Sequence, residues 1–143
     1  MRHEYFHATG AALRPPEWRI VDMLRNADDL DSLHRDLAGR IGAPRADQAL
    51  HGFCDMLGLL RTHGWHMPLT LCAGARSVSD DERAIARFVL HCAEQDRDSA
   101  TAEAMMLVAP HAILPLVSAG ERMGLPLLCE ECRERLRCPL TFQ

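Results

Sequence analysis

The sequence contains no lysine, and all sixteen of its basic residues are arginine. An arginine side chain stays protonated and forms no Schiff base. The absence of lysine therefore excludes covalent lysine catalysis, a lysine general base and the lysine of a phosphate-binding P-loop. The G-x-S-x-G motif of many serine hydrolases and the G-x-G-x-x-G motif of dinucleotide-binding proteins are also absent. We therefore expect no catalytic residues and a protein that is not an enzyme.

Long hydrophobic runs are missing too. No stretch approaches the ~18 apolar residues of a membrane-spanning helix, and residues 1–25 lack the apolar core of a signal peptide. We expect a cytoplasmic protein that makes no membrane contact, in which the six cysteines are reduced and serve as buried hydrophobic residues or metal ligands. The net charge of −4 disfavours strong electrostatic binding to nucleic acid.

Helix signals recur along most of the 143 residues, separated by proline and glycine. This pattern predicts an all-α fold, a compact single-domain bundle of five to seven short helices over residues 15–143. Residues 1–14 are expected to form a mobile N-terminus. The segment near residues 65–75 contains Pro68 and has no helical period, so we predict a short irregular or two-stranded segment there.

The clearest helix is predicted over residues 45–63. Its apolar residues follow a 4-3-4-3 spacing that places them on one face, and Gly64 is expected to end it. The residues of this face are Ala46, Leu50, Phe53, Leu57 and Leu60. We expect this helix to be the most buried element of the fold.

Further boundaries are predicted from capping residues, proline and glycine. Ser79, with Glu82 three residues later, forms the capping box of one helix. Asp98 or Ser99 is expected to cap the next helix. A helix over residues 111–123 is expected to end at Gly124, and a separate helix is expected to start at Pro126.

A zinc site is one alternative reading of the cysteines and histidines. Two close pairs and one further cysteine have side chains that zinc prefers, and they are His63, His66, Cys129, Cys132 and Cys138. The two pairs are separated by 62 residues, far more than the ~12–20 typical of a zinc module. Cys129 and Cys132 also fit the apolar face of a helix. We therefore expect no cofactor and keep zinc as an alternative.

A second zinc pattern lies at the N-terminus, where His3, Glu4 and His7 match the H-E-x-x-H motif of zinc proteases. In such an enzyme the motif lies on a helix that follows substrate-holding strands. Only two residues precede it here, so we interpret these residues as surface side chains of the N-terminus.

A DNA-binding reading concerns residues 33–53, which resemble a helix-turn-helix in their apolar spacing around Gly42. The residues expected to contact DNA in this reading are Arg40, Arg45 and Gln48. Asp47 and Asp55 lie on the candidate reading helix, and carboxylates near phosphate weaken binding. An αα-corner inside a helical core is the favoured interpretation.

The leading functional hypothesis is a regulatory or adaptor protein that binds other proteins through helix faces. Hydrophobic residues make up 48% of the chain, more than several short amphipathic helices readily bury. Symmetric pairing is the commonest way to cover such an excess, so we expect a homodimer. A DNA-binding regulator, and a zinc-binding module or zinc-dependent enzyme, are the alternatives.

Overall fold

The computed structural model describes the backbone of residues 13–137 and the side chains of residues 13–128. Within that part of the chain the fold consists of α-helices and one short 3-10 helix, in the order α1 (Pro15–Arg25), α2 (Leu30–Ile41), α3 (Ala43–His63), α4 (Asp80–Ala93), α5 (Arg97–Leu107), η2 (Pro110–Ala112) and α6 (Ile113–Arg137). The predicted all-α bundle is confirmed. None of the helices described has the length and apolar content to span a bilayer.

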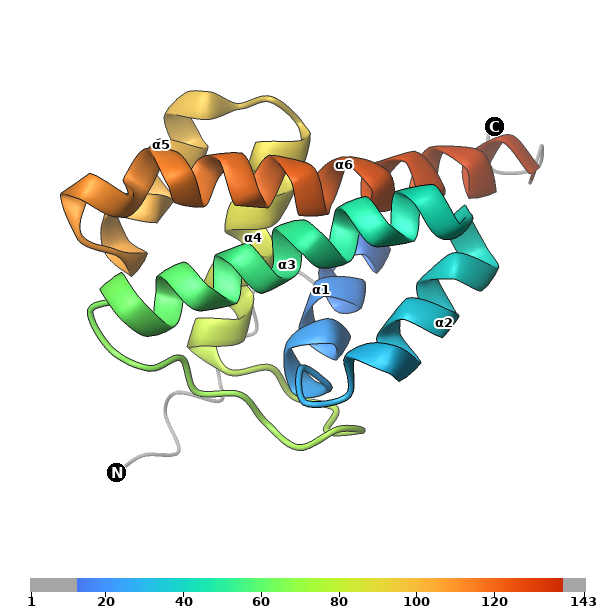
Figure 1. The fold of residues 1–143 in the computed structure, drawn as a ribbon, viewed down its shortest axis with the longest axis horizontal. Helices are drawn as coiled ribbons and strands as arrows, with labels where there is room; N and C mark the ends of the chain where they lie inside the picture. Colours follow the sequence, from blue (N-terminus) through green and yellow to red (C-terminus); the bar gives the residue numbers. More distant parts are fainter. Residues whose placement is uncertain (1–12, 138–143) are drawn as a thin grey trace.

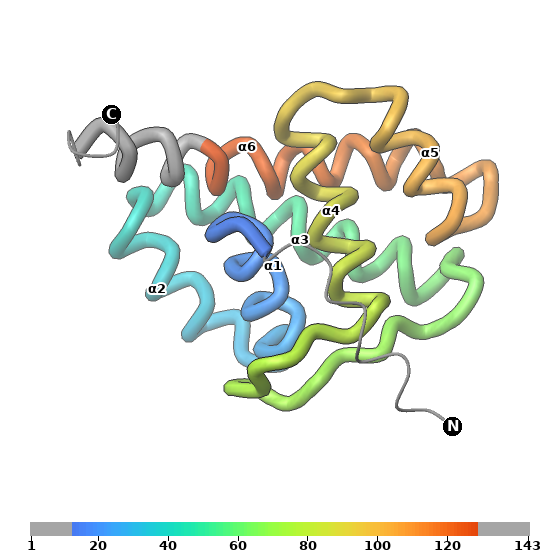
Figure 2. Tube along the Cα trace, turned by 180° about the vertical axis from the view of Figure 1, so that it is seen from behind, coloured from blue at the N-terminus to red at the C-terminus, as the bar shows by residue number. Residues whose placement is uncertain are grey.

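The two longest helices, α3 and α6, run side by side in opposite directions along the long axis of the molecule (Figure 1). Helix α4 crosses behind them and packs against α6, α1 and α5. Seen from behind, α1 lies between α2 and α4 (Figure 2). The C-terminal end of α3, the C-terminal end of α5 and the start of α6 therefore meet at one end of the bundle.

Helix starts largely follow the capping signals in the sequence. The Asp29 side chain accepts a hydrogen bond from the Ser32 N–H, and the Ser79–Glu82 capping box is formed as predicted. Helix α5 differs, because its cap is Asp96, which accepts from the Ser99 N–H and starts the helix earlier than predicted. The packed part of the chain includes Leu13, which contacts the core ahead of α1.

The prediction of two helices divided at Gly124 is wrong, because α6 continues through Gly124 and Pro126. Gly124 serves helix packing rather than termination. A Cβ atom there would lie 2.9 Å from both the Ala93 Cβ and the Val89 carbonyl oxygen of α4. Absence of a side chain thus lets α4 and α6 approach closely, and contacts of this kind override a local stop signal.

The buried face of α3 is centred on smaller residues than the spacing predicted. Phe53 is fully buried, but Leu50 and Leu57 lie at the margin of the core. The residues of α3 that are buried are Ala46, Ala49, Gly52, Phe53, Met56 and Leu60. Helix α4 has eight buried residues in 14, against six in 21 for α3, so α3 is not the most buried element.

The segment between α3 and α4 forms no sheet in the described structure, and a single bridge joins Gly64 to Val108. Arg25 holds this segment in place, because its guanidinium donates hydrogen bonds to the carbonyl oxygens of Ala75 at 2.8 Å and Ser77 at 2.7 Å. Arg25 also pairs with Glu82 at 2.8 Å, and both side chains are buried. An irregular segment is therefore held in place by a charged pair inside the fold.

The Glu82 carboxylate also accepts hydrogen bonds from the N–H groups of Leu71 and Ser79. Burial by itself would raise the pKa of Glu82. The hydrogen bonds from Arg25, Ser79 and Leu71 outweigh burial and hold the pKa below its usual value. Glu82 is thus ionised in the folded protein at neutral pH.

Candidate functional site

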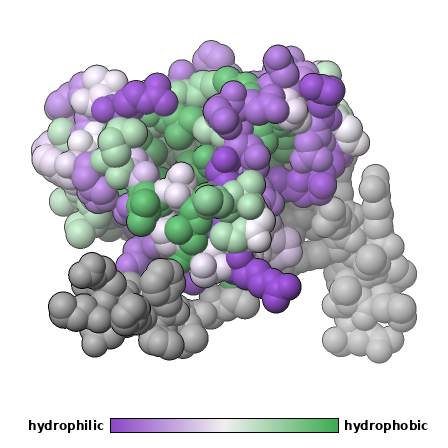
Figure 3. All heavy atoms as spheres, turned by 90° about the horizontal axis from the view of Figure 1, so that it is seen from below, coloured by the Kyte–Doolittle hydropathy of each residue, from purple (hydrophilic) through white to green (hydrophobic). Residues whose placement is uncertain are grey.

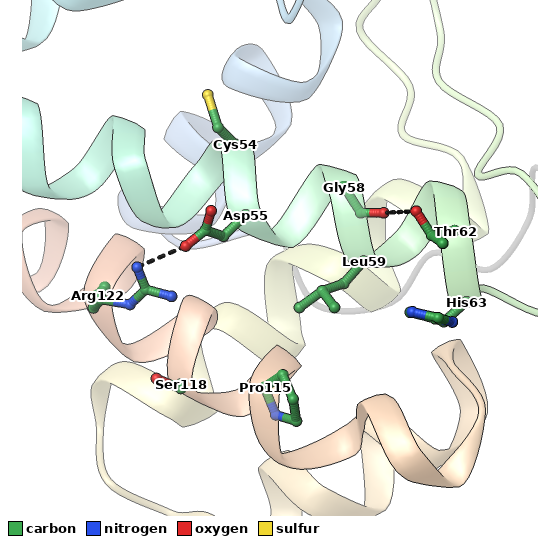
Figure 4. A pocket seen from close by; sticks show the side chains of 9 residues that line it. All are labelled: Cys54, Asp55, Gly58, Leu59, Thr62, His63, Pro115, Ser118 and Arg122. Carbon is green, nitrogen blue, oxygen red and sulfur yellow. Dashed lines mark hydrogen bonds and ion pairs between the residues drawn. The ribbon is translucent and has the colours of Figure 1, made fainter.

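A groove of about 540 Å³ runs between α3 and α6 (Figure 4). Its lining combines polar, charged and apolar side chains from both helices. The lining residues are Cys54, Asp55, Gly58, Leu59, Thr62 and His63 of α3, and Pro115, Ser118 and Arg122 of α6. Small-molecule sites are concave and combine apolar walls with a few polar groups, so this groove is a candidate ligand site.

Two glycines of α3 shape the groove. At Gly52 the helices touch so closely that a Cβ atom would lie 2.7 Å from the Met123 nitrogen and 2.8 Å from the Ala119 carbonyl oxygen. At Gly58 no atom beyond the neighbouring residues and backbone of α3 itself lies within 4 Å of such a Cβ position. The close contact at one glycine holds the helices together, and the absence of a side chain at the other leaves the groove open.

At one end of the groove, Arg122 donates a hydrogen bond to Asp55 at 2.7 Å (Figure 4). The same guanidinium nitrogen lies 3.1 Å from the Nδ1 atom of His51. The Arg122 and Asp55 side chains are 37% and 44% exposed, so the pair contributes at most about 1 kcal/mol to stability. The groove therefore presents charges of both signs to solvent at this end.

At the other end lie His63 and His111. The Nδ1 atom of His63 is 3.1 Å from the Nε2 atom of His111, and the two rings meet edge to face with centroids 4.6 Å apart. His63 ends α3, and η2 carries His111. A backbone hydrogen bond of 3.0 Å from the Ala109 N–H to the His63 carbonyl joins the two segments.

The three cysteines with described side chains have different environments. Cys54 and Cys72 are exposed and Cys92 is buried. Burial, reinforced by the nearby carboxylates of Glu121 and Glu103, raises the pKa of the Cys92 thiol to about 12. Cys92 is therefore a protonated core residue at neutral pH and not a nucleophile.

The residues predicted for zinc are not brought together as one set in the described structure. His63 contacts His111, whereas His66 contacts Asp81 at 3.1 Å. Cys129 and Cys132 belong to α6, but their side chains lie outside the described residues, as does Cys138. Among the side chains that are described, no group of three His, Cys, Asp or Glu is arranged to hold a metal ion. The zinc reading with the cysteines stays a prediction, as does the N-terminal one, because His3, Glu4 and His7 also lie outside the described residues.

The residues predicted for DNA binding lie on the surface of α2 and α3. Arg40 pairs with Asp36 at 3.2 Å, Arg45 is exposed, and Gln48 donates to the Arg122 carbonyl at 3.5 Å. Only Gly42 separates α2 from α3, whereas a helix-turn-helix has a turn of about three to four residues. The connection is shorter than that turn, and DNA contact by these residues stays a prediction.

A second surface feature adjoins the histidines, and we call it the apolar surface. We give this name to four exposed large apolar side chains, those of Trp65 and Met67, which follow α3, and of Met105 and Met106 in α5. The indole N–H of Trp65 donates to the Met105 carbonyl at 3.0 Å. On the face that carries the segment after α3, hydrophobic side chains are exposed among hydrophilic ones (Figure 3).

Sequence reasoning missed His111, Arg122 and Trp65 as candidate functional residues. The partners of His111 and Arg122 are 48 and 67 residues away in the chain. No local spacing relates residues so far apart. The exposure of Trp65 could not be predicted either, because tryptophan side chains are on average largely buried.

Comparisons with known proteins give no further guide. No protein-family model matches the sequence, and searches of curated proteins and of solved structures found no significant similarity.

Proposed function

We propose that the protein is a non-enzymatic regulatory or adaptor protein that binds another protein through the apolar surface. The observation that carries this proposal is the exposure of four large apolar side chains. Trp65 is 58%, Met67 65%, Met105 57% and Met106 76% exposed. Large apolar side chains exposed together mark interaction sites, since leaving them in water forgoes the free energy of burial.

The types of side chain also suit protein recognition. Methionine is unbranched and adapts to an irregular partner surface, and tryptophan is enriched among the residues that dominate binding energy. Trp65 is held in place by two hydrogen bonds to α5, from its indole N–H to Met105 and from its backbone N–H to the Leu107 carbonyl at 3.2 Å. A partner would therefore meet an aromatic ring that is already positioned, which lowers the entropic cost of binding.

A second copy of the chain is the partner that we propose first. In a twofold dimer the same surface faces itself, so one exposed apolar surface is sufficient for both partners. Covering it would remove the four exposed side chains from water.

Sedimentation velocity of the purified protein over a wide range of concentrations tests this proposal. We expect the 16.0 kDa chain to form a dimer that Met106→Glu shifts to monomer, because the new carboxylate would be buried in the contact. Leu30→Glu is the matched control. Leu30 is also a large apolar residue that is 38% exposed, but it lies at the start of α2 and not on the apolar surface. A wild-type protein that stays monomeric would reject the homodimer, and a dimer unaffected by Met106→Glu would place the contact elsewhere.

A further inference from the structure

His63 and His111 have the geometry of two ligands of one metal ion. Their facing nitrogen atoms are 3.1 Å apart. Two nitrogens each about 2.0–2.1 Å from one zinc ion, at angles between about 90° and 109°, lie roughly 2.9–3.4 Å from each other. We propose that His63 and His111 form an open binding site for a first-row divalent transition-metal ion of the zinc, nickel or copper class.

The distance between the two rings agrees with this assignment. The centroids of the two rings are 4.6 Å apart. Two imidazoles whose lone pairs converge on one ion place their centroids roughly 4.5–5.2 Å apart, whereas a straight N–H···N hydrogen bond of this length places them at about 5.4 Å. The observed centroid distance therefore falls within the range of two rings bound to one ion and below that of a straight hydrogen bond.

The backbone holds the two ligands in register without a metal. The Gly64–Val108 bridge and the hydrogen bond from the Ala109 N–H to the His63 carbonyl join the chain beside His63 to the chain that leads into η2. Binding an ion there requires no rearrangement of the backbone, so little conformational entropy is lost.

The proton balance of binding is simple. In the hydrogen-bonded pair one facing nitrogen carries a proton and the other accepts it. On metal binding the donor ring takes its other tautomer, with the proton on Nε2 of His63 or Nδ1 of His111. Both facing nitrogens then offer lone pairs, and two neutral rings release no net proton.

The ligand set determines the class of ion. Neutral imidazole nitrogens select zinc, nickel and copper over magnesium and calcium, which prefer oxygen ligands. Other described histidines lie against carboxylates, as His34 does with Asp47 at 2.6 Å and His66 with Asp81 at 3.1 Å. His63 and His111 are thus the one pair of histidine rings in mutual contact within residues 13–128.

Since only two described side chains converge, the remaining coordination positions are open to water or to another molecule. His63 also lines the groove between α3 and α6. A molecule bound in the groove could therefore supply a further ligand to the ion. Metal binding by His63 and His111 is independent of the protein contact proposed above.

Titration calorimetry of the full-length protein with Ni²⁺ tests the site. The variants are His63→Ala, His111→Ala, the double variant, and His66→Ala as the control three residues from His63. We expect each single variant to lose at least about tenfold in affinity at one site, and the double variant to lose no more than either single one, because a chelate fails when either ligand is removed. His66→Ala should bind as the wild type does.

Nuclear magnetic resonance locates the ion in the same samples. Paramagnetic Ni²⁺ should first broaden the amide signals of Gly64, which follows His63, and of Ala109, which lies two residues before His111. Circular dichroism of each variant confirms that the helices are retained. Absence of Ni²⁺ binding, binding unchanged in both single variants, losses that add in the double variant, or broadening centred elsewhere would each overturn the proposal.

Discussion

Two glycines of α3 are expected to respond in opposite directions to the same substitution. In Gly52→Ala the new methyl carbon would lie 2.7 Å and 2.8 Å from backbone atoms of α6, well inside the ~3.5 Å of ordinary contact. Backbone atoms cannot rotate away, so α6 must move. Overpacking of this kind costs about 1–3 kcal/mol, and the better helix propensity of alanine returns about 0.5–1 kcal/mol. We expect the free energy of unfolding to fall by roughly 1–2 kcal/mol.

In Gly58→Ala the methyl group meets no atom within 4 Å. Only the helix propensity changes, so we expect the free energy of unfolding to rise by about 0.5–1 kcal/mol. The two variants should therefore differ by roughly 2 kcal/mol, although they make the same chemical change in one helix.

Urea unfolding followed by circular dichroism measures this difference. The midpoint should fall for Gly52→Ala and rise for Gly58→Ala with the slope unchanged, since neither variant alters the surface exposed on unfolding. A stabilised Gly52→Ala would refute the tight α3–α6 contact. A destabilised Gly58→Ala would refute an open groove at that position.

Three further predictions concern the core and three carboxylates. Phe53→Ala should lower the free energy of unfolding by about 3–5 kcal/mol because the ring is fully buried. Asp55→Ala should lower it by less than about 1 kcal/mol because the pair that Asp55 forms with Arg122 is exposed. Urea unfolding of both variants measures these losses, and equal losses would contradict the prediction. Arg25→Met should cost about 3–5 kcal/mol of stability, because it leaves the buried Glu82 carboxylate without its ion-pair partner, and it should speed amide exchange in the segment after α3. Arg25→Met combined with Glu82→Leu should recover stability. If it does not, the ion pair is not the cause of the loss. Burial raises the pKa of Glu103, against the opposing effect of His91 and Arg87, so ionisation of this carboxyl opposes folding as pH rises through the folded pKa. Glu103→Gln should therefore stabilise the protein more at pH 7 than at pH 4. An equal change in stability at both pH values would contradict this.

Local chemistry made the helical architecture predictable. Ser79 and Glu82 form a capping box within one turn, and Gly64 follows α3 as predicted. Such signals involve backbone groups three or four residues away, so they act whatever the rest of the fold does. Gly124 behaves differently because its role depends on α4, which lies far away in the sequence.

The candidate site was much less predictable, since its residues pair across the fold. Asp55 with Arg122 and His63 with His111 are 67 and 48 residues apart. Which side chains meet depends on the angle and depth at which helices cross, and those depend on small residues such as Gly52. The sequence identified His63 as a candidate ligand but paired it with His66, the nearest histidine along the chain, instead of His111.

Photo-crosslinking in cells that naturally make the protein tests the central proposal most directly. A photoreactive amino acid replaces Met106 on the apolar surface in one sample and Leu30 on α2 in the control sample. We expect a crosslinked product, a dimer or a complex with one defined protein, at position 106 and none at position 30. No product at position 106, or the same products at both positions, would contradict a protein contact at the apolar surface.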